Sequence, residues 1–281
     1  MDDRPGGGQG VLLTDGSARR LELASLLGDA AMDAAVAAMA TAIARRLSVR
    51  RRPRKRRAEQ GIGALTSMPY TYRSDEIDLD RTIEVLAERP VPDDTDVVVR
   101  ERTGNRRSVV LIVDVSGSMR GEKVRIAAAT VAALCADLTG LHDQLGVVAF
   151  WSDAALIKRL TDSTTATRLL DTLLRIPARG LTNVGFGLDV AQTELRRSAA
   201  PQRTAILLSD AVHNAGPDPR ILAHRFPELH VLLETDGEHD HQLGRDLARL
   251  GRGTVTPIRT HREVAPALNR ILDRQRRAAR G

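Results

Sequence analysis

One apolar run, Val109–Val113, constrains the fold more than any other feature of the chain. Five consecutive apolar residues, most of them β-branched, are typical of a central strand in a parallel sheet that is covered on both faces. The run continues into Asp114-Val115-Ser116-Gly117-Ser118, which places one carboxylate and two hydroxyls at alternate positions where the backbone must turn. Hard oxygen ligands of this kind suit Mg²⁺ and suit softer metals poorly.

From Ser108 onward, expected strands alternate with expected helices. We expect strands at 109–115, 145–151, 155–160, 204–209, 229–233 and 253–258. We expect helices at 122–138, 165–175, 184–197, 219–226, 241–250 and 263–276. This alternation predicts an α/β fold with right-handed crossovers and a mostly parallel sheet that carries helices on both faces. The strand pair within 145–160 is expected to supply one antiparallel edge strand.

The first 107 residues follow no such pattern. We divide the chain into residues 1–57, a lead-in segment at 58–107, and a domain at 108–281. The first part has a Gly-rich start at 1–10 that we expect to be disordered, Ala-rich helices at 21–47, and a basic arm at 45–57. The lead-in segment is expected to hold a short helix, Leu79–Glu88, ended by the prolines that follow it, and a strand at 97–99.

The positive charge of the chain is concentrated in the basic arm. Nine Lys and Arg and no acidic residue lie in 45–57, so removing them from the net charge of +6 leaves −3 for the remainder. Such an arm can bind nucleic acid or another polyanion. The more ordinary interpretation of such a run is a solvated linker or arm. The arm has no aromatic residues among its cations, which argues against recognition of single strands by stacking.

The composition of the chain and the motifs that it lacks argue against a secreted protein, a membrane protein and an enzyme. The single cysteine excludes an internal disulfide and fits a reducing compartment. The N-terminus does not read as a secretory signal, and no apolar stretch is long enough to span a membrane. We therefore expect a cytoplasmic protein. The sequence holds no P-loop and no nucleophile elbow, so we expect no enzyme activity.

Two further loops are expected to reach the polar end of strand 109–115. In open α/β sheets, ligands bind outside the carboxyl ends of the strands. One loop, 179–185, carries Thr182 just before a helix, and the other places Asp210 at the end of strand 204–209. A rival carboxylate, Asp236, follows strand 229–233, but that strand should lie one position further from the centre of the sheet. We therefore favour Asp210.

These motifs resemble those of the von Willebrand factor A (VWA) domain. Its D-x-S-x-S motif corresponds to Asp114, Ser116 and Ser118, its G-x-T-[ND] loop contains Thr182, and its strand-end aspartate is Asp210. The resemblance covers about 108–281. It implies a Rossmann-like VWA fold and a metal-ion-dependent adhesion site (MIDAS), in which the hydroxyls contact the ion and the two aspartates act directly or through water. The family often has Asp-Gly where this chain has Asp210-Ala211.

The implied ion is Mg²⁺, with Mn²⁺ as a possible substitute. Only two carboxylates neutralise it, and Mg²⁺ usually keeps exchangeable water. An acidic residue of a protein ligand can therefore complete its coordination.

The lead-in segment extends the resemblance to a subgroup. Residues 77–83, 97–100 and 106–108 are similar to the region before the domain in bacterial intracellular VWA proteins, which include the CoxE-like group and the magnesium chelatase D subunit. Their partners are AAA+ ATPases of the MoxR or chelatase I-subunit kind. The chain lacks the AAA+-like domain and the acidic, proline-rich linker of the D subunit, so we do not expect it to be that subunit.

Three functions follow as expectations. The first is a Mg²⁺-dependent adaptor that works with an AAA+ ATPase in protein remodelling or metal-cofactor maturation. The second is a nucleic-acid-binding or polyanion-binding VWA protein that uses the basic arm. The third is a non-catalytic subunit of a metal-insertion complex similar to magnesium chelatase.

Overall fold

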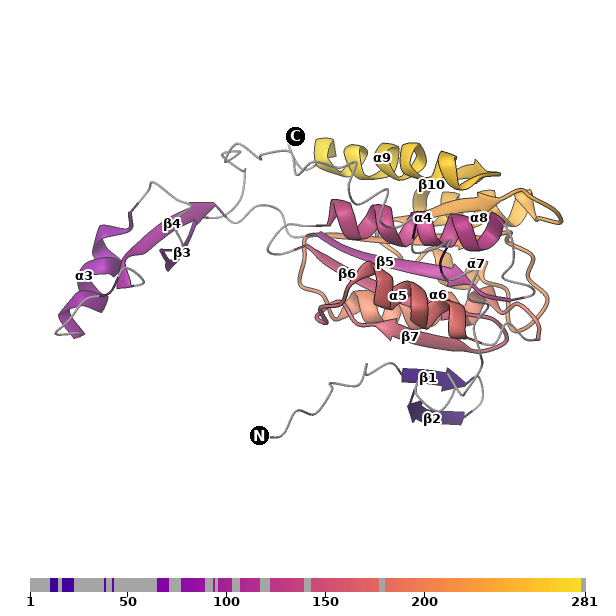
Figure 1. The fold of residues 1–281 in the computed structure, drawn as a ribbon, viewed down its shortest axis with the longest axis horizontal. Coiled ribbons are helices and arrows are strands. Elements are labelled where there is room, and N and C mark those ends of the chain that lie inside the picture. Colours follow the sequence, from indigo (N-terminus) through magenta and orange to yellow (C-terminus); the bar gives the residue numbers. More distant parts are fainter. Residues whose placement is uncertain are drawn as a thin grey trace.

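A computed structural model describes residues 11–14, 17–22, 38, 42, 65–70, 77–88, 93, 96–102, 107–116, 122–138, 143–176 and 180–278. Its main sheet has eight strands in the order β10-β9-β8-β5-β6-β7-β1-β2 (Figure 1). Their bounds are β1 Val11–Thr14, β2 Ser17–Glu22, β5 Arg107–Asp114, β6 Gln144–Phe150, β7 Ala154–Lys158, β8 Gln202–Ser209, β9 Leu229–Glu234 and β10 Arg252–Ile258. The strand expected from the apolar run is β5, and it lies between β6 and β8 in the interior of the sheet.

The expected parallel arrangement is confirmed. Strand β5 pairs in parallel with both β6 and β8, and β8, β9 and β10 continue the sheet in parallel. Seven of the eight residues of β5 are buried, as a strand covered on both faces requires. Strand β7 runs antiparallel to β6 and supplies the expected antiparallel edge.

The antiparallel edge extends further than the sequence indicated. Strand β1 pairs antiparallel with β7, and β2 pairs antiparallel with β1. The hairpin provides hydrogen-bond partners for the backbone of β7, which would otherwise end the sheet with unpaired groups. Residues 11–22 fall within the first part of our division, so this hairpin is a piece of the N-terminal segment that joins the sheet of the domain.

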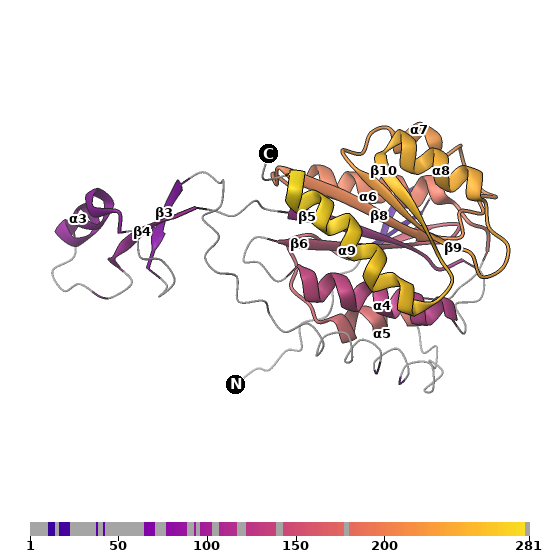
Figure 2. The same cartoon turned by 90° about the horizontal axis from the view of Figure 1, so that it is seen from above.

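The helices cover both faces of the sheet (Figure 2). Their bounds are α4 Glu122–Asp137, α5 Ala166–Arg175, α6 Val184–Arg196, α7 Arg220–Ala223, α8 His241–Leu250 and α9 His261–Ala278. Helices α4, α5 and α9 share one apolar cluster with Val109, Leu111 and Val113, whereas α6, α7 and α8 share the other with Val110 and Ile112. Successive residues of β5 thus point into opposite cores.

The lead-in segment forms a second, two-stranded sheet with one helix. Strands β3 (Leu65–Pro69) and β4 (Val98–Arg102) pair antiparallel, and α3 spans Leu79–Glu88 as expected. Asp78 organises this unit, because its carboxylate accepts hydrogen bonds from the Ser67 hydroxyl, from Arg100 and from the backbone N–H of Arg81 in the first turn of α3. These bonds hold the pKa of Asp78 at about 2.

The remaining N-terminal expectations concern segments that are largely outside the described residues. Leu21 and Glu22 belong to β2, so the Ala-rich helical region begins later than we expected. Ala38 and Ala42 are helical. The rest of 23–47, the Gly-rich start and the basic arm at 45–57 lie outside the described residues. No helix in the described part of the chain is long and apolar enough to cross a membrane.

Candidate metal centre

Three segments that are distant in sequence meet at the carboxyl end of the central strands. Strand β5 ends at Asp114, β8 ends at Ser209, and residues 180–183 lead into α6. Parallel strands bring their carboxyl ends to one edge of the sheet, which is where ligands bind in folds of this kind. The structure thereby brings together four of the five predicted metal ligands, Asp114, Ser116, Thr182 and Asp210.

Asp114 accepts hydrogen bonds on both carboxylate oxygens. Its Oδ1 accepts one from the Ser116 hydroxyl at 2.5 Å and one from the Ser116 backbone N–H at 2.9 Å. Its Oδ2 accepts one from the Ser209 hydroxyl at 2.6 Å. The backbone bond two residues on is the local turn that an aspartate favours, and it starts the departure of the chain from β5.

Thr182 extends this network to the second loop. Its hydroxyl donates to the Ser116 hydroxyl at 2.6 Å, and its backbone N–H donates to the Asn214 side chain at 2.6 Å. The next residue, Asn183, caps the first turn of α6 by accepting from the backbone N–H of Phe186 at 3.0 Å. The start of α6 therefore fixes the position of the Thr182 hydroxyl.

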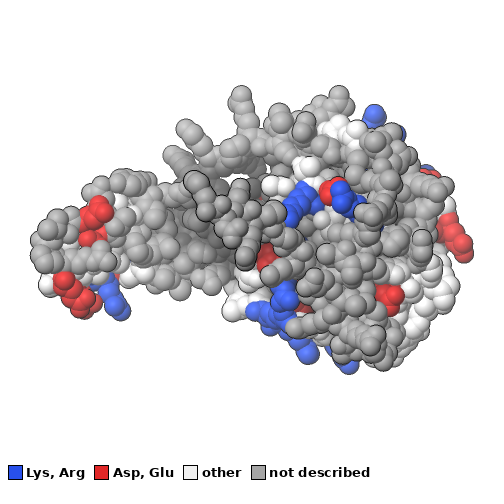
Figure 3. All heavy atoms as spheres, turned by 60° about the horizontal axis from the view of Figure 1, so that its bottom comes forward, with Lys and Arg blue, Asp and Glu red and all other residues white. Residues whose placement is uncertain are grey.

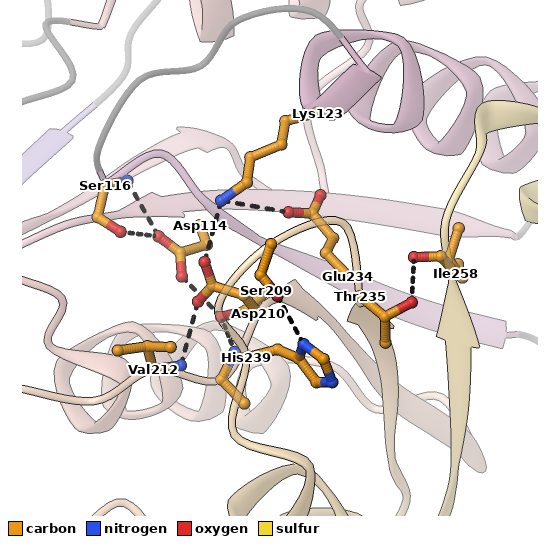
Figure 4. A network of polar contacts seen from close by, with 12 residues as sticks. Asp114, Ser116, Lys123, Ser209, Asp210, Val212, Glu234, Thr235, His239 and Ile258 are labelled. Atoms are coloured by element: carbon orange, nitrogen blue, oxygen red, sulfur yellow. Dashed lines mark hydrogen bonds and ion pairs between the residues drawn. The ribbon is translucent and has the colours of Figure 1, made fainter.

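Asp210 approaches from the end of β8 and is held by two donors. Its Oδ2 accepts from the Lys123 ammonium at 3.0 Å, and its Oδ1 accepts from the backbone N–H of Val212 at 3.1 Å (Figure 4). The rival carboxylate, Asp236, is exposed and follows β9, one strand further out. The structure therefore places Asp210 beside Asp114, as we expected.

The residue after Asp210, Ala211, adopts a backbone conformation that favours glycine. Ala211 has a φ of 61°, in the left-handed region that glycine adopts more readily than any other residue. The Asp-Gly sequence common in VWA domains is therefore matched to this backbone turn. Here alanine adopts the same conformation, with its methyl group fully buried in the core.

Burial disfavours the ionised form of the carboxyl groups in this cluster and so raises their pKa values. Enclosure by protein atoms raises the pKa of Asp114 to about 6, and the charge of Asp210 adds to that increase, while the hydrogen bonds from Ser116 and Ser209 oppose it. Burial likewise raises the pKa of Glu234, at the end of β9, to about 8. Burial alone would lower the pKa of Lys123, but the hydrogen bond and charge of Asp210 raise it above its ordinary value.

Sequence reasoning missed three residues of this network: Lys123, Ser209 and Glu234. Ser209 and Glu234 end strands that we had located, so a polar residue at the carboxyl end of each strand was the available signal. Lys123 lies in the first turn of α4, where a cation is unfavourable beside the positive end of the helix dipole. That unusual position was its signal.

One predicted ligand cannot be placed: Ser118, the fifth, lies outside the described residues. Among the described residues near the site, Leu181 is 53% exposed beside Thr182. His213 is half-buried, and its Nδ1 has no hydrogen-bond partner among the described residues.

The donor set fits a hard divalent cation. Asp114 forms no ion pair with any described Lys, Arg or His side chain, so its buried carboxylate is hydrogen-bonded but lacks a direct counter-charge. The described residues contain no group of three His, Cys, Asp or Glu arranged as metal ligands, so an ion here depends on the hydroxyls of Ser116 and Thr182. Carboxylate and hydroxyl oxygens favour Mg²⁺ or Mn²⁺.

Comparison with known proteins supports the fold. Residues 109–213 match the family model of the von Willebrand factor type A domain. No curated protein matches the chain. Proximal thread matrix protein 1 from the mussel byssus is similar in structure, with 18% identity and a TM-score of 0.50 over 60% of this chain and 47% of that one. The chain therefore spans about half of the mussel protein.

Two further solved structures are similar to this chain. An aerotolerance-related membrane protein from Bacteroides fragilis has 16% identity and a TM-score of 0.49, over 60% of this chain and 99% of that one. Another structure of the mussel protein has a MIDAS motif occupied by zinc, with 17% identity and a TM-score of 0.49 over 60% of this chain and 47% of that one. At these identities, the likeness concerns the fold alone.

Proposed function

We propose that the protein is a VWA-type, non-enzymatic, Mg²⁺-dependent protein-binding adaptor, a proposal supported by the match of residues 109–213 to the VWA family model. The single observation that carries this proposal is the convergence of Asp114, Ser116, Thr182 and Asp210 at the carboxyl end of the central strands. Ser118, which follows Ser116 by two residues, would supply the third hydroxyl.

A partner carboxylate is the ligand chemistry that suits such an ion. Two aspartates neutralise a divalent charge only when both are ionised, and hydroxyls add coordination without charge. A carboxylate from another protein can replace a bound water and gain from the remaining positive field. The exposed Leu181 side chain beside Thr182 offers apolar contact area for the residues around that carboxylate.

We further propose that the partner is an AAA+ ATPase of the MoxR or chelatase I-subunit kind, in the cytoplasm. This rests on the resemblance of the lead-in segment to bacterial intracellular VWA proteins. The small β3–α3–β4 unit is the structural form of that segment. In such a pair, the VWA protein supplies recognition and the ATPase supplies the energy for remodelling or metal-cofactor maturation.

Metal binding is tested by calorimetric titration of Mg²⁺ and Mn²⁺ into the full chain after treatment with EDTA. Ser116→Ala and Thr182→Ala should each weaken binding at least roughly tenfold, because each removes an oxygen ligand and a hydrogen bond of the network. Ser198→Ala is the matched control, since this serine hydroxyl follows α6 and bonds to Ser108 near the start of β5, at the opposite end of the strand. Unchanged affinity in both site variants would refute the metal centre.

Partner binding is tested by affinity capture from native lysate with Mg²⁺ or with EDTA, followed by mass spectrometry. We expect an AAA+ ATPase with the wild-type protein in Mg²⁺, and its loss with EDTA or with Thr182→Ala. An identical set of partners in Mg²⁺ and EDTA would show that the interface lies away from the ion.

The polyanion alternative gains no specific support from the described residues. On the face drawn in Figure 3, Lys and Arg side chains stand among Asp and Glu rather than forming a field of one sign. The basic arm at 45–57 lies outside the described residues. Salt-dependent binding of the full chain to duplex DNA, lost on deletion of 45–57, would favour this alternative.

A further inference from the structure

Lys123 occupies a position that helix electrostatics disfavours. It is the second residue of α4, where the unpaired backbone N–H groups carry partial positive charge and a cation is destabilising. Its side chain is only 29% exposed, so water screens that repulsion incompletely. An attraction elsewhere must hold the ammonium there, and the structure shows what provides it.

The attraction comes from two carboxyl groups at the ends of neighbouring strands. The Lys123 ammonium lies 3.0 Å from Asp210 Oδ2 and 4.0 Å from Glu234 Oε2. Asp210 is one of the proposed metal ligands, whereas Glu234 lies one strand further out, at the end of β9. Figure 4 shows the ammonium between the two carboxyl groups. The cation therefore faces a ligand of the metal site on one side and a buried acid outside that site on the other.

We propose that Lys123 is a tethered cation that neutralises Asp210 in the metal-free protein and moves toward Glu234 when a divalent ion binds. This inference rests on the proposed metal site and adds a residue that sets its affinity. A divalent ion and an ammonium cannot both lie against Asp210 without strong repulsion, because two positive centres a few ångströms apart interact at low effective dielectric. Binding of the ion is then an exchange of one cation for another.

Glu234 gives the displaced ammonium a place to go. Its side chain is 8% exposed, and Lys123 is its only ion-pair partner in the described part of the chain. A lysine side chain has a flexible four-carbon stem, so the ammonium can move from one carboxyl group to the other without a change in the backbone of α4. Without an acid at position 234, the displaced ammonium would stay close to the ion in a poorly solvated site.

The exchange also favours divalent ions over monovalent ones. A sodium or potassium ion brings no more charge than the ammonium it must displace, and the ammonium is already tethered. A magnesium ion brings twice that charge and gains the oxygen ligands of Asp114, Ser116 and Thr182. Lys123 therefore excludes monovalent cations from the site and reduces the affinity for divalent ones.

The test is a set of variants titrated with Mg²⁺ and Mn²⁺ by calorimetry at constant ionic strength and at a constant pH above 8, where most Glu234 carboxyl groups are ionised. Lys123→Met removes the competing charge and should lower Kd for both ions at least roughly tenfold. Arg125→Met is the matched control: it removes a cation from the same turn of α4 whose ion pair is with Glu122, and it should leave Kd unchanged within about twofold. A raised or unchanged Kd in Lys123→Met would overturn the proposal.

Glu234→Gln provides the second, independent measurement. It should raise Kd at least roughly threefold in the wild-type background, because the displaced ammonium loses its acceptor. In the Lys123→Met background the same change should have no effect, which makes the coupling between the two residues the diagnostic result. An equal effect of Glu234→Gln in both backgrounds would overturn the exchange.

These outcomes separate the inference from the proposed function. Metal binding by the wild-type protein that is insensitive to Lys123→Met would leave the metal site intact and refute only the tethered cation. If neither the wild-type protein nor Lys123→Met, shown to be folded by circular dichroism, binds either ion, both are refuted. Should Lys123→Met fail to fold, the raised Kd expected for Glu234→Gln alone still decides the inference.

Discussion

Replacing Arg107 with methionine should destabilise the domain without affecting its metal site. Arg107 begins β5 and is 4% exposed. Its guanidinium makes two hydrogen bonds to Asp143, at 3.1 and 2.5 Å, and a third to Asp137 Oδ2 at 3.2 Å. Burial alone would lower the pKa of Arg107, but these two carboxylates raise it. The guanidinium therefore stays charged and is needed to balance both acids.

The expected loss follows from the burial of all three side chains. The Arg107, Asp137 and Asp143 side chains are each 5% exposed, so methionine would leave two carboxylates with little access to water. Removing one partner of a buried ion pair typically costs 3–5 kcal/mol, and we expect a loss of about that size. Against a typical total stability of roughly 5–15 kcal/mol, this is a large fraction.

The assay is urea unfolding of the metal-free protein, followed by the fluorescence of Trp151. This is the only tryptophan of the chain, and it is buried directly after β6. The midpoint should fall with little change in slope, and Tm should fall by roughly 6–20 °C. Arg125→Met, which breaks a half-exposed ion pair, should change stability by less than about 0.5 kcal/mol.

Two further results test the reasoning. The triple variant Arg107→Met, Asp137→Asn, Asp143→Asn also removes the two carboxylate charges that Arg107 faces and should recover at least half of the lost stability. Metal affinity should be unchanged in the folded single variant, because Arg107 and Asp114 lie at opposite ends of an eight-residue strand, roughly 23 Å apart. A loss below about 1 kcal/mol in Arg107→Met, or no recovery in the triple variant, would show that this buried pair does not stabilise the domain as argued.

Three other predictions concern different parts of the domain. Gly216 has a φ of 79°, and an added Cβ would lie 2.5 Å from the Asn183 amide. Gly216→Ala should therefore lower the free energy of unfolding, measured in urea, by about 1–3 kcal/mol. It should also weaken Mg²⁺ binding, because a shift of Asn183 would displace the neighbouring Thr182. Burial raises the pKa of the Cys135 thiol from 9.0 to about 11. Because the thiolate is the reactive form, DTNB at pH 8 should react with Cys135 at least roughly a hundredfold more slowly than with free cysteine, and the rate should rise as pH approaches 11. A rate like that of free cysteine would contradict the burial of this thiol. Deletion of residues 1–57 should leave a folded domain by circular dichroism but expose the edge of β7, so gel filtration should show concentration-dependent self-association that the full chain lacks.

Most of the domain could be predicted because its elements are marked locally in the sequence. Helix α3 was expected with its observed bounds, and β5 was expected from its apolar run. Strand order and the common edge of parallel strands indicated which loops meet at the site. Within those loops, the resemblance to the VWA motif selected Asp114, Ser116, Ser118, Thr182 and Asp210, and their role as metal ligands remains a prediction.

The hairpin β1–β2 was not foreseen, since pairing with β7 depends on a contact more than 140 residues away in the chain. Its strands carry no long apolar run. Strand β1 pairs with the backbone edge of β7, and a sequence pattern does not express that edge.

The α/β sheet, the order of its core elements and the polar residues that end its central strands all follow from local sequence patterns. Periodic burial and strand-end chemistry are local properties, so they can be read from neighbouring residues. In contrast, the position of Lys123 between Asp210 and Glu234 and the hydrogen bond from Ser209 to Asp114 appear only in the folded domain. These contacts join α4, β5, β8 and β9, and the directions of side chains from four separate elements are set by packing rather than by the order of residues along the chain.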